Sequence, residues 1–200
     1  KFHQALVARK DIPWQKLHAI AVDEFWAPHI PRECSVCEQP RRDLYQHVPL
    51  ARVSMLDFAA EDPEAERARY ERIVRDHPPH VACLGIGVSG HLAFNEPGDS
   101  VFDEHQPVKI IDVCEESKSQ LMSDPNFKGL GKIPEKGITI TIPTLLSADS
   151  IFCLAPYRIK AEIIRDMFDA GITTHLPATV LKTHPNTRLY LDEESYSLCQ

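Results

Sequence analysis

The sequence lacks any apolar run long enough to cross a membrane, and no signal peptide stands at its N-terminus. These absences argue against a membrane protein and favour a cytoplasmic one. Internal repeats, low-complexity tracts and linkers are also missing, so we expect a single domain over residues 1–200. With 43% apolar and 26% charged residues, the composition is ordinary for a globular protein with a substantial core.

An excess of positive charge is missing as well. The formal net charge is -7, so the surface as a whole lacks the positive charge that binds nucleic acids. We therefore expect no nucleic-acid partner. An acidic protein can still bind a small anion at a helix N-terminus or at a few well-placed Arg and Lys side chains.

A disulfide or metal framework has little support in the sequence. The six cysteines lie in a chain with enough core residues to fold without disulfides, so we expect reduced thiols. Cys34-Ser35-Val36-Cys37 is a C-x-x-C motif without a second pair, whereas structural zinc usually takes four protein ligands. We therefore expect no metal and no organic cofactor.

Short apolar runs alternate with helical patterns along the chain. Helices are predicted at the N-terminus, over Glu64–Arg75 and over Arg158–Phe168. Several strand-like runs are continuously apolar, which is typical of a sheet covered on both faces. We predict an α/β fold with a single open, mostly parallel, doubly wound sheet and helices on both faces, as in Rossmann-like three-layer proteins. The predicted strands are Ala19–Val22, Val81–Gly85, Ile138–Ile142, Ile151–Leu154 and Leu189–Leu191.

The segment Leu84–Gly98 directly follows one of these strands, at the position where ligands bind in open α/β sheets. Its spacing Gly85-x-Gly87-x-x-Gly90 matches a dinucleotide fingerprint, which must open a helix. Asn95-Glu96-Pro97-Gly98 interrupts any such helix, so we reject a dinucleotide site.

Two titratable residues in this segment can carry acid–base chemistry. His91 can accept or donate a proton near neutral pH, and a carboxylate such as Glu96 can orient it and support its charged form. The alternative from the residues alone is a loop histidine bonded to a carbonyl, with Glu96 in solvent.

The segment resembles the glucosamine-6-phosphate deaminase signature G-[IV]-G-x-[DN]-G-H-[IL]-A-F-N-E-P. Other strings of that family follow in family order over nearly the whole chain. They are Val22–Trp26, Leu154–Arg158, Pro177–Asn186 and Leu191–Glu193. The sequence therefore resembles the glucosamine-6-phosphate deaminase/isomerase family, which is related to 6-phosphogluconolactonase.

The resemblance implies roles for three residues. Asp23 matches the carboxylate that moves a proton between C1 and C2 of the open-chain sugar, and its alternative is an Asp that caps a loop. His91 matches the residue that opens the sugar ring through protons at O1 and O5. Glu96 matches the carboxylate that holds this histidine. Glu24 is a weaker candidate with a structural role.

Substrate contacts are also implied, with departures from the family pattern. Ser89 and Gly90 are placed at the substrate, but the family usually has an acidic residue where Ser89 stands. A hydroxyl cannot bear a compensating charge, so the imidazolium should be less stabilised. Arg158 matches a basic residue at the phosphate, and Lys160 is the second choice; their alternative is solvated helix charge.

The family's phosphate loop is another departure, since the sequence contains no Gly-Gly and begins at Lys1 inside an amphipathic segment. We expect that the first strand and the phosphate loop of the family are absent from this chain.

Three functions remain open on this basis. The first is aldose–ketose isomerisation of a hexosamine 6-phosphate, with or without loss of ammonia. The second is a 6-phosphogluconolactonase-like hydrolase, although those enzymes resemble G-H-[TS]-A-S-L-F-P, where this sequence has Leu92–Pro97 after His91. The third is a non-catalytic sugar-phosphate-binding protein. The expected partner is a small sugar phosphate; the hexosamine epimer and a homo-oligomer stay open.

Overall fold

The computed structural model describes residues 2–123, 127 and 132–199. The chain divides into two compact units. Unit 1 comprises Lys1–Ile73 and Ile110–Ile138, and unit 2 comprises Val74–Lys109 and Thr139–Gln200. A single domain over residues 1–200 stays a prediction. None of the helices within the described ranges is long and apolar enough to cross a membrane.

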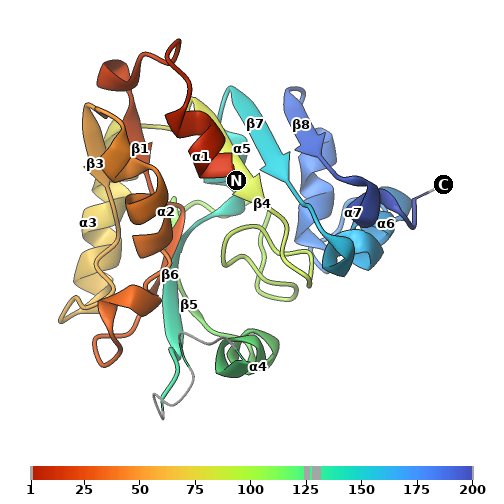
Figure 1. The fold of residues 1–200 in the computed structure, drawn as a ribbon. Helices are drawn as coiled ribbons and strands as arrows, with labels where there is room; N and C mark the ends of the chain where they lie inside the picture. The colour runs from red at the N-terminus through yellow and green to blue at the C-terminus, as the bar shows by residue number, and fades with distance from the viewer. Residues whose placement is uncertain (1, 124–126, 128–131, 200) are drawn as a thin grey trace. The chain divides into compact units, whose positions relative to one another are not determined.

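Strands and helices alternate along the chain (Figure 1). The strands are β1 His18–Ile20, β2 Asp23–Trp26, β3 Arg52–Ser54, β4 Val81–Gly85, β5 Val108–Asp112, β6 Lys136–Ile140, β7 Ser150–Leu154 and β8 Thr187–Tyr190. The α-helices are α1 Phe2–Val7, α2 Glu38–Asp43, α3 Pro63–Asp76, α4 Glu115–Ser123, α5 Ile142–Leu146, α6 Ala161–Asp169 and α7 Glu193–Tyr196. Short 3-10 helices are η1 Trp14–Lys16, η2 Arg32–Cys34, η3 Tyr45–His47, η4 Arg158–Lys160 and η5 Pro177–Thr183.

The α/β class is confirmed, with sheets that mix parallel and antiparallel pairing and do not close. The strands lie in three sheets among the described residues, rather than in the one sheet expected. Their orders are β1-β3, β2-β6-β5 and β4-β7-β8. The pairs β1–β3, β4–β7 and β7–β8 are parallel, as predicted for βαβ units.

The strand predicted over Ala19–Val22 shows why the sheet divides. The chain pairs with β3 through Ile20 and then opens β2 at Asp23 in another sheet. At the break, the buried Tyr70 hydroxyl donates to the carbonyls of Ala21 and Ser54, at 2.7 and 3.0 Å. The Tyr70 hydroxyl thus provides a hydrogen-bond donor for two backbone carbonyls that a continuous strand ladder would otherwise have to pair.

The expectation of a sheet covered on both faces is wrong for β4. Ala82 and Leu84 are buried, whereas Val81 is 57% exposed and Cys83 is also exposed. β7 meets the expectation better, since Ile151 and Cys153 are fully buried on one face and the residues of the other face are half-buried instead of exposed. An apolar run indicates which side chains are stabilised by burial. The packing of other helices and strands against the run decides which of those side chains are covered.

Two further strand predictions need correction. The strand expected over Ile138–Ile142 ends at Ile140, because Pro143 favours the first turn of α5. β3 and β5 were missed, since β3 has only three residues and β5 is short and mixed in polarity. α3 and α6 lie where helices were predicted, with η4 in place of the first turn of the second helix.

Candidate active site

The loop after β4 carries the histidine that the sequence indicated (Figure 1). Every residue between Gly85 and Val108 is described and none forms a helix, which agrees with the rejection of a dinucleotide site. Tight turns shape the loop instead. Gly90 N donates to the Gly87 carbonyl and Gly87 N donates to the His91 carbonyl, both at 3.0 Å.

Asn95 anchors this loop inside unit 2. Its side chain is 1% exposed, and Nδ2 donates to the carbonyls of Leu92 and Ile140, each at 2.9 Å. Phe94 N donates to the hydroxyl of Thr139 at 3.2 Å. The loop is therefore tied to residues about 45 positions later in the chain, so that His91 projects from a fixed backbone.

Ser89, His91 and Glu96 form one hydrogen-bonded group. His91 Nδ1 lies 2.9 Å from Glu96 Oε1 and 2.8 Å from Ser89 Oγ. The Ser89 hydroxyl donates to Glu96 Oε2 at 2.7 Å. The imidazole side chain is 23% exposed and the Glu96 side chain 12%. Glu96 therefore contacts the imidazole and does not lie in solvent, as the alternative had it, whereas the catalytic roles of His91 and Glu96 stay predictions.

The same contacts select the tautomer of His91. A carboxylate only accepts hydrogen bonds, and the Ser89 hydroxyl already donates to Glu96, so Nδ1 carries the ring proton. Both contacts are on Nδ1, which leaves Nε2 to exchange a proton with a ligand. The arrangement can therefore act as a general base in the neutral form and as a general acid when protonated.

Gly87, which the sequence marked only as part of a dinucleotide-like spacing, lies directly against the imidazole of His91. A Cβ atom at Gly87 would lie 2.1 to 2.4 Å from three atoms of the His91 ring, so the imidazole rests directly on the glycine backbone. Gly90 has a φ of +84°, and a Cβ there would lie 2.1 Å from Leu176 Cδ1 and 3.2 Å from Ile163 Cδ1. The glycine spacing was visible in the sequence. In the structure, Gly87 leaves room for the imidazole of His91, and Gly90 allows the positive φ of the turn.

Asp23 belongs to unit 1. It opens β2 instead of ending a strand, because the chain changes sheets between Ile20 and Asp23. The residue is 9% exposed, and its carbonyl accepts a hydrogen bond from Cys37 Sγ at 3.5 Å. The proton-transfer role that the family resemblance implies for Asp23 stays a prediction.

The C-x-x-C motif is part of the packing around Asp23. Cys34 and Cys37 are both buried, and neither forms a disulfide. Burial, followed by the nearby charge of Glu24, raises the pKa of Cys37 far above its ordinary value, so the thiol stays protonated. In the described part of the chain, no cluster of three or more His, Cys, Asp or Glu side chains could hold a metal.

Arg158 and Lys160 lie in η4 at the start of α6, and they differ in environment. The Arg158 guanidinium donates to the Ser197 hydroxyl, and its backbone N–H donates to Glu194 Oε2 at 3.3 Å. Lys160 is half-buried, and burial lowers the pKa of its ammonium from the ordinary value. Lys160 directly precedes α6 and is three positions before Ile163, whose Cδ1 would lie 3.2 Å from a Cβ atom at Gly90.

An α/β fold with a carboxylate-supported histidine after a parallel strand is an arrangement typical of acid–base enzymes. The family model described as Glucosamine-6-phosphate isomerases/6-phosphogluconolactonase matches residues 1–190. The chain belongs to this family of sugar-phosphate enzymes.

Individual relatives agree with this membership. Glucosamine-6-phosphate deaminase of Streptococcus pyogenes serotype M1 is 30% identical over 196 residues, which are 98% of this chain and 81% of the relative. The deaminase of Lactobacillus delbrueckii subsp. bulgaricus is 29% identical over 200 residues, which are 99% and 82% of the two chains.

Solved structures support the fold. A monomeric glucosamine-6-phosphate deaminase superposes with a TM-score of 0.86 at 26% identity, over 98% of this chain and 82% of the other. A 6-phosphogluconolactonase from Thermotoga maritima gives a TM-score of 0.71 at 19% identity, over 94% and 78%, which bears on the fold alone.

Proposed function

We propose that this protein converts a hexosamine 6-phosphate of the glucosamine-6-phosphate type into a ketose phosphate with loss of ammonia. The observation that carries the proposal is the Ser89–His91–Glu96 group, which leaves His91 Nε2 available on a backbone held by Asn95. Sugar-ring opening needs one group that takes a proton from one oxygen and returns a proton to another.

His91 performs this first step. In its neutral form, Nε2 accepts the proton of the O1 hydroxyl, and the imidazolium so formed gives a proton to the ring oxygen O5. The C1–O5 bond breaks and the open-chain aldehyde forms. Glu96 stabilises the intermediate imidazolium because its carboxylate lies 2.9 Å from Nδ1.

Asp23 performs the second step, as its match to the family position implies. Its carboxylate removes the proton on C2 and returns it to C1, while O1 gains the proton that the C2 ammonium group of the substrate loses. The product carries a C2=N iminium, which water hydrolyses to the ketone and ammonium. These steps balance with one water molecule and need no metal or organic cofactor.

Lys160 supplies the positive charge for the substrate phosphate in this proposal. The family pattern placed Arg158 first, but its guanidinium donates to Ser197 and its backbone amide to Glu194. Lys160 is three positions before Ile163, whose side chain lies near Gly90, and it is partly withdrawn from water, which strengthens its attraction for an anion. Arg158 and Gly90 remain predicted substrate contacts of the same region.

Replacement of Lys160 by methionine is expected to raise KM for glucosamine 6-phosphate by about 10- to 100-fold, with a smaller change in kcat. The reason is that a phosphate far from the reacting carbons contributes mainly uniform binding. Steady-state kinetics at fixed ionic strength measures this change. Arg158→Met is the matched variant, with an expected rise below about 3-fold; an equal or larger rise for Arg158→Met would reverse the assignment.

A 6-phosphogluconolactonase-like hydrolase is the second candidate, since family members include such enzymes. Leu92–Pro97 after His91 matches the deaminase string instead of the lactonase one. Parallel assays of the intact protein with glucosamine 6-phosphate, galactosamine 6-phosphate and 6-phosphogluconolactone separate these functions and identify the epimer. Binding of the amino sugars by calorimetry without turnover of any of the three would instead support a non-catalytic binding protein.

Ser89 makes the charge of the site testable. Ser89→Asp is expected to raise kcat several-fold, because a second carboxylate next to Nδ1 stabilises the imidazolium that forms during ring opening. Ser89→Asn is the control, since it has nearly the same size as Asp without the charge, and its kcat should not exceed that of the wild type. Comparable kcat values for the two variants would contradict the proposed effect of charge.

The remaining expectations do not enter these steps. A cytoplasmic location stays a prediction, and so does the absence of the family's first strand and phosphate loop. One solved relative is described as monomeric. Gel filtration of the intact protein distinguishes a monomer from a homo-oligomer.

A further inference from the structure

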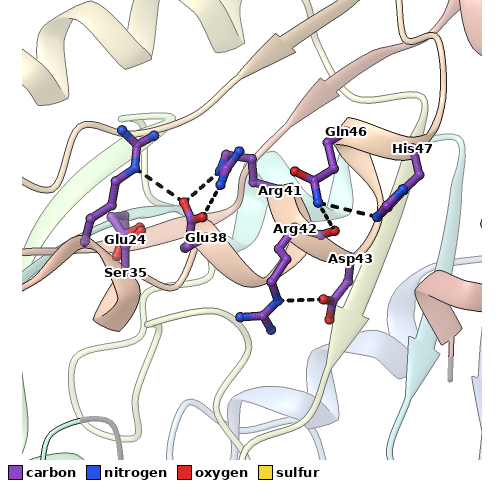
Figure 2. Close-up of polar contacts among 9 residues, drawn as sticks. Glu24, Ser35, Glu38, Arg41, Arg42, Asp43, Gln46 and His47 are labelled. Atoms are coloured by element: carbon purple, nitrogen blue, oxygen red, sulfur yellow. Dashed lines mark hydrogen bonds and ion pairs between the residues drawn. The ribbon is translucent and has the colours of Figure 1, made fainter.

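Glu24 is a buried carboxylate that the proposed chemistry does not use. It is 1% exposed and lies directly after Asp23 in β2. Oε1 accepts hydrogen bonds from Phe25 N at 2.8 Å and Val36 N at 2.9 Å. Oε2 accepts from Cys37 N at 2.9 Å and from the hydroxyl of Ser35 (Figure 2). Four donors thus surround one charge, which is the arrangement that makes a buried carboxylate tolerable.

These donors come mainly from a segment 11 to 13 positions further along the chain. Three of the four belong to Ser35, Val36 and Cys37, which lead into α2. Glu24 therefore ties this segment to the beginning of β2. The Cys37 thiol adds a second tie, because it donates to the Asp23 carbonyl at 3.5 Å.

Two contacts therefore hold the backbone at Asp23. The segment 35–37 donates hydrogen bonds both to the Asp23 carbonyl and to the carboxylate of the neighbouring Glu24. Proton transfer between adjacent carbons needs a carboxylate placed to within a fraction of an ångström, since a shift of about 1 Å can cost about 100-fold in rate. A rigid support at this position has a direct consequence for the rate.

We propose that Glu24 and the segment Ser35–Cys37 form a clamp that positions the Asp23 carboxylate over the substrate carbons. The inference rests on the proposed function, because it assigns Glu24 to the support of its proton-transfer residue. Glu24 is a positioning residue that touches neither substrate nor reacting atoms.

The chemistry of the clamp requires a carboxylate. A glutamine in place of Glu24 keeps the size but replaces one acceptor oxygen by an amide group that only donates. That group would face N–H or O–H donors whichever way the side chain is turned, so at least one contact becomes repulsive. The segment 35–37 then shifts, and the Asp23 backbone with it.

The test compares the kinetics of variants of the intact protein, with glucosamine 6-phosphate as the substrate. Glu24→Gln is expected to lower kcat by about 10- to 100-fold with KM changed by less than about 3-fold, since the defect lies in placement and not in binding. Ser35→Ala removes one donor and is expected to lower kcat in the same direction by a few-fold. Circular dichroism and thermal unfolding show whether each variant folds, and Ser35→Ala carries the test if Glu24→Gln does not.

Glu38→Gln is the matched control. Glu38 lies close by and is also hydrogen-bonded, but its partners are the guanidinium groups of Arg41 and Arg32, so it lies outside the clamp (Figure 2). Loss of its charge is expected to change kcat by less than about 2-fold, because its guanidinium partners remain accessible to water and ion pairs of this kind contribute little.

A double-mutant cycle separates positioning from a general structural role. In the Asp23→Asn background, Glu24→Gln is expected to add less than about 3-fold to the loss of kcat, because the residue it positions is already inactive. A full additional loss in that background would overturn the inference, and so would a wild-type kcat in folded Glu24→Gln and Ser35→Ala. Lack of turnover by the wild type would instead contradict the proposed function, and this inference falls with it.

Discussion

Asp23→Asn is expected to lower kcat for glucosamine 6-phosphate by about 100- to 10,000-fold, the usual contribution of a general acid or base. Asparagine retains the size of the side chain and its ability to hydrogen-bond, but it cannot take a proton from carbon. The backbone at this position is held by Cys37 and by the neighbouring Glu24, so the substitution should leave β2 in place. Stopped assays with the intact protein measure kcat and KM.

The step affected by Asp23→Asn can be identified as well. Exchange of the C2 hydrogen with solvent deuterium should be lost in the variant, whereas ring opening by His91 should persist. Asp11→Asn is the control, because Asp11 is an exposed carboxylate of unit 1 paired with Arg9 and should have almost no effect. A wild-type kcat in Asp23→Asn would remove this residue from the mechanism.

Gly87→Ala is expected to lower kcat by at least about 100-fold, because it displaces the imidazole from its position. The added Cβ would lie 2.1 Å from Cε1, 2.2 Å from Nε2 and 2.4 Å from Nδ1 of His91, distances that no real contact reaches. The ring must therefore move, and its bonds with Ser89 and Glu96 must break or lengthen. The loss occurs although none of the predicted catalytic residues is changed.

Gly85→Ala provides a matched control in the same segment. A Cβ at Gly85 would lie 3.7 Å from the Leu154 carbonyl oxygen, which is an ordinary van der Waals contact. We expect kcat within about 2-fold of the wild type and a small change in stability, as for other surface substitutions without a clash. Equal activities of the two alanine variants would show that the imidazole is not seated on Gly87 as described.

The sequence indicated which residues could form a site, but not how they contact one another. His91 and Glu96 were selected because they are titratable and follow an apolar strand, and the structure joins them through Nδ1. Arg158 was preferred to Lys160 on the family pattern, yet its hydrogen bond with Ser197 comes from a residue 39 positions away. No local sequence pattern predicts such a partner, because the contact between Arg158 and Ser197 depends on how α7 packs beside η4.

Fold prediction succeeded where the signal is local and failed where it is not. β4, β7 and α3 follow from apolar runs and periodicity, which reflect burial of neighbouring residues. The division into three sheets was not foreseen, because strand pairing joins distant segments and Tyr70 bonds across the break after Ala21.

The amino-acid sequence alone determined the chemical groups of this protein and their family, since side-chain types and their order are local information. Tertiary structure decided which of these groups contact one another. Ser89 and Glu96 converge on one nitrogen of His91, Asn95 ties their loop to Ile140, and Glu24 gathers its donors from a distant segment. Hydrogen-bond partners are set by the folding of remote parts of the chain into contact, and residue order does not encode that geometry directly.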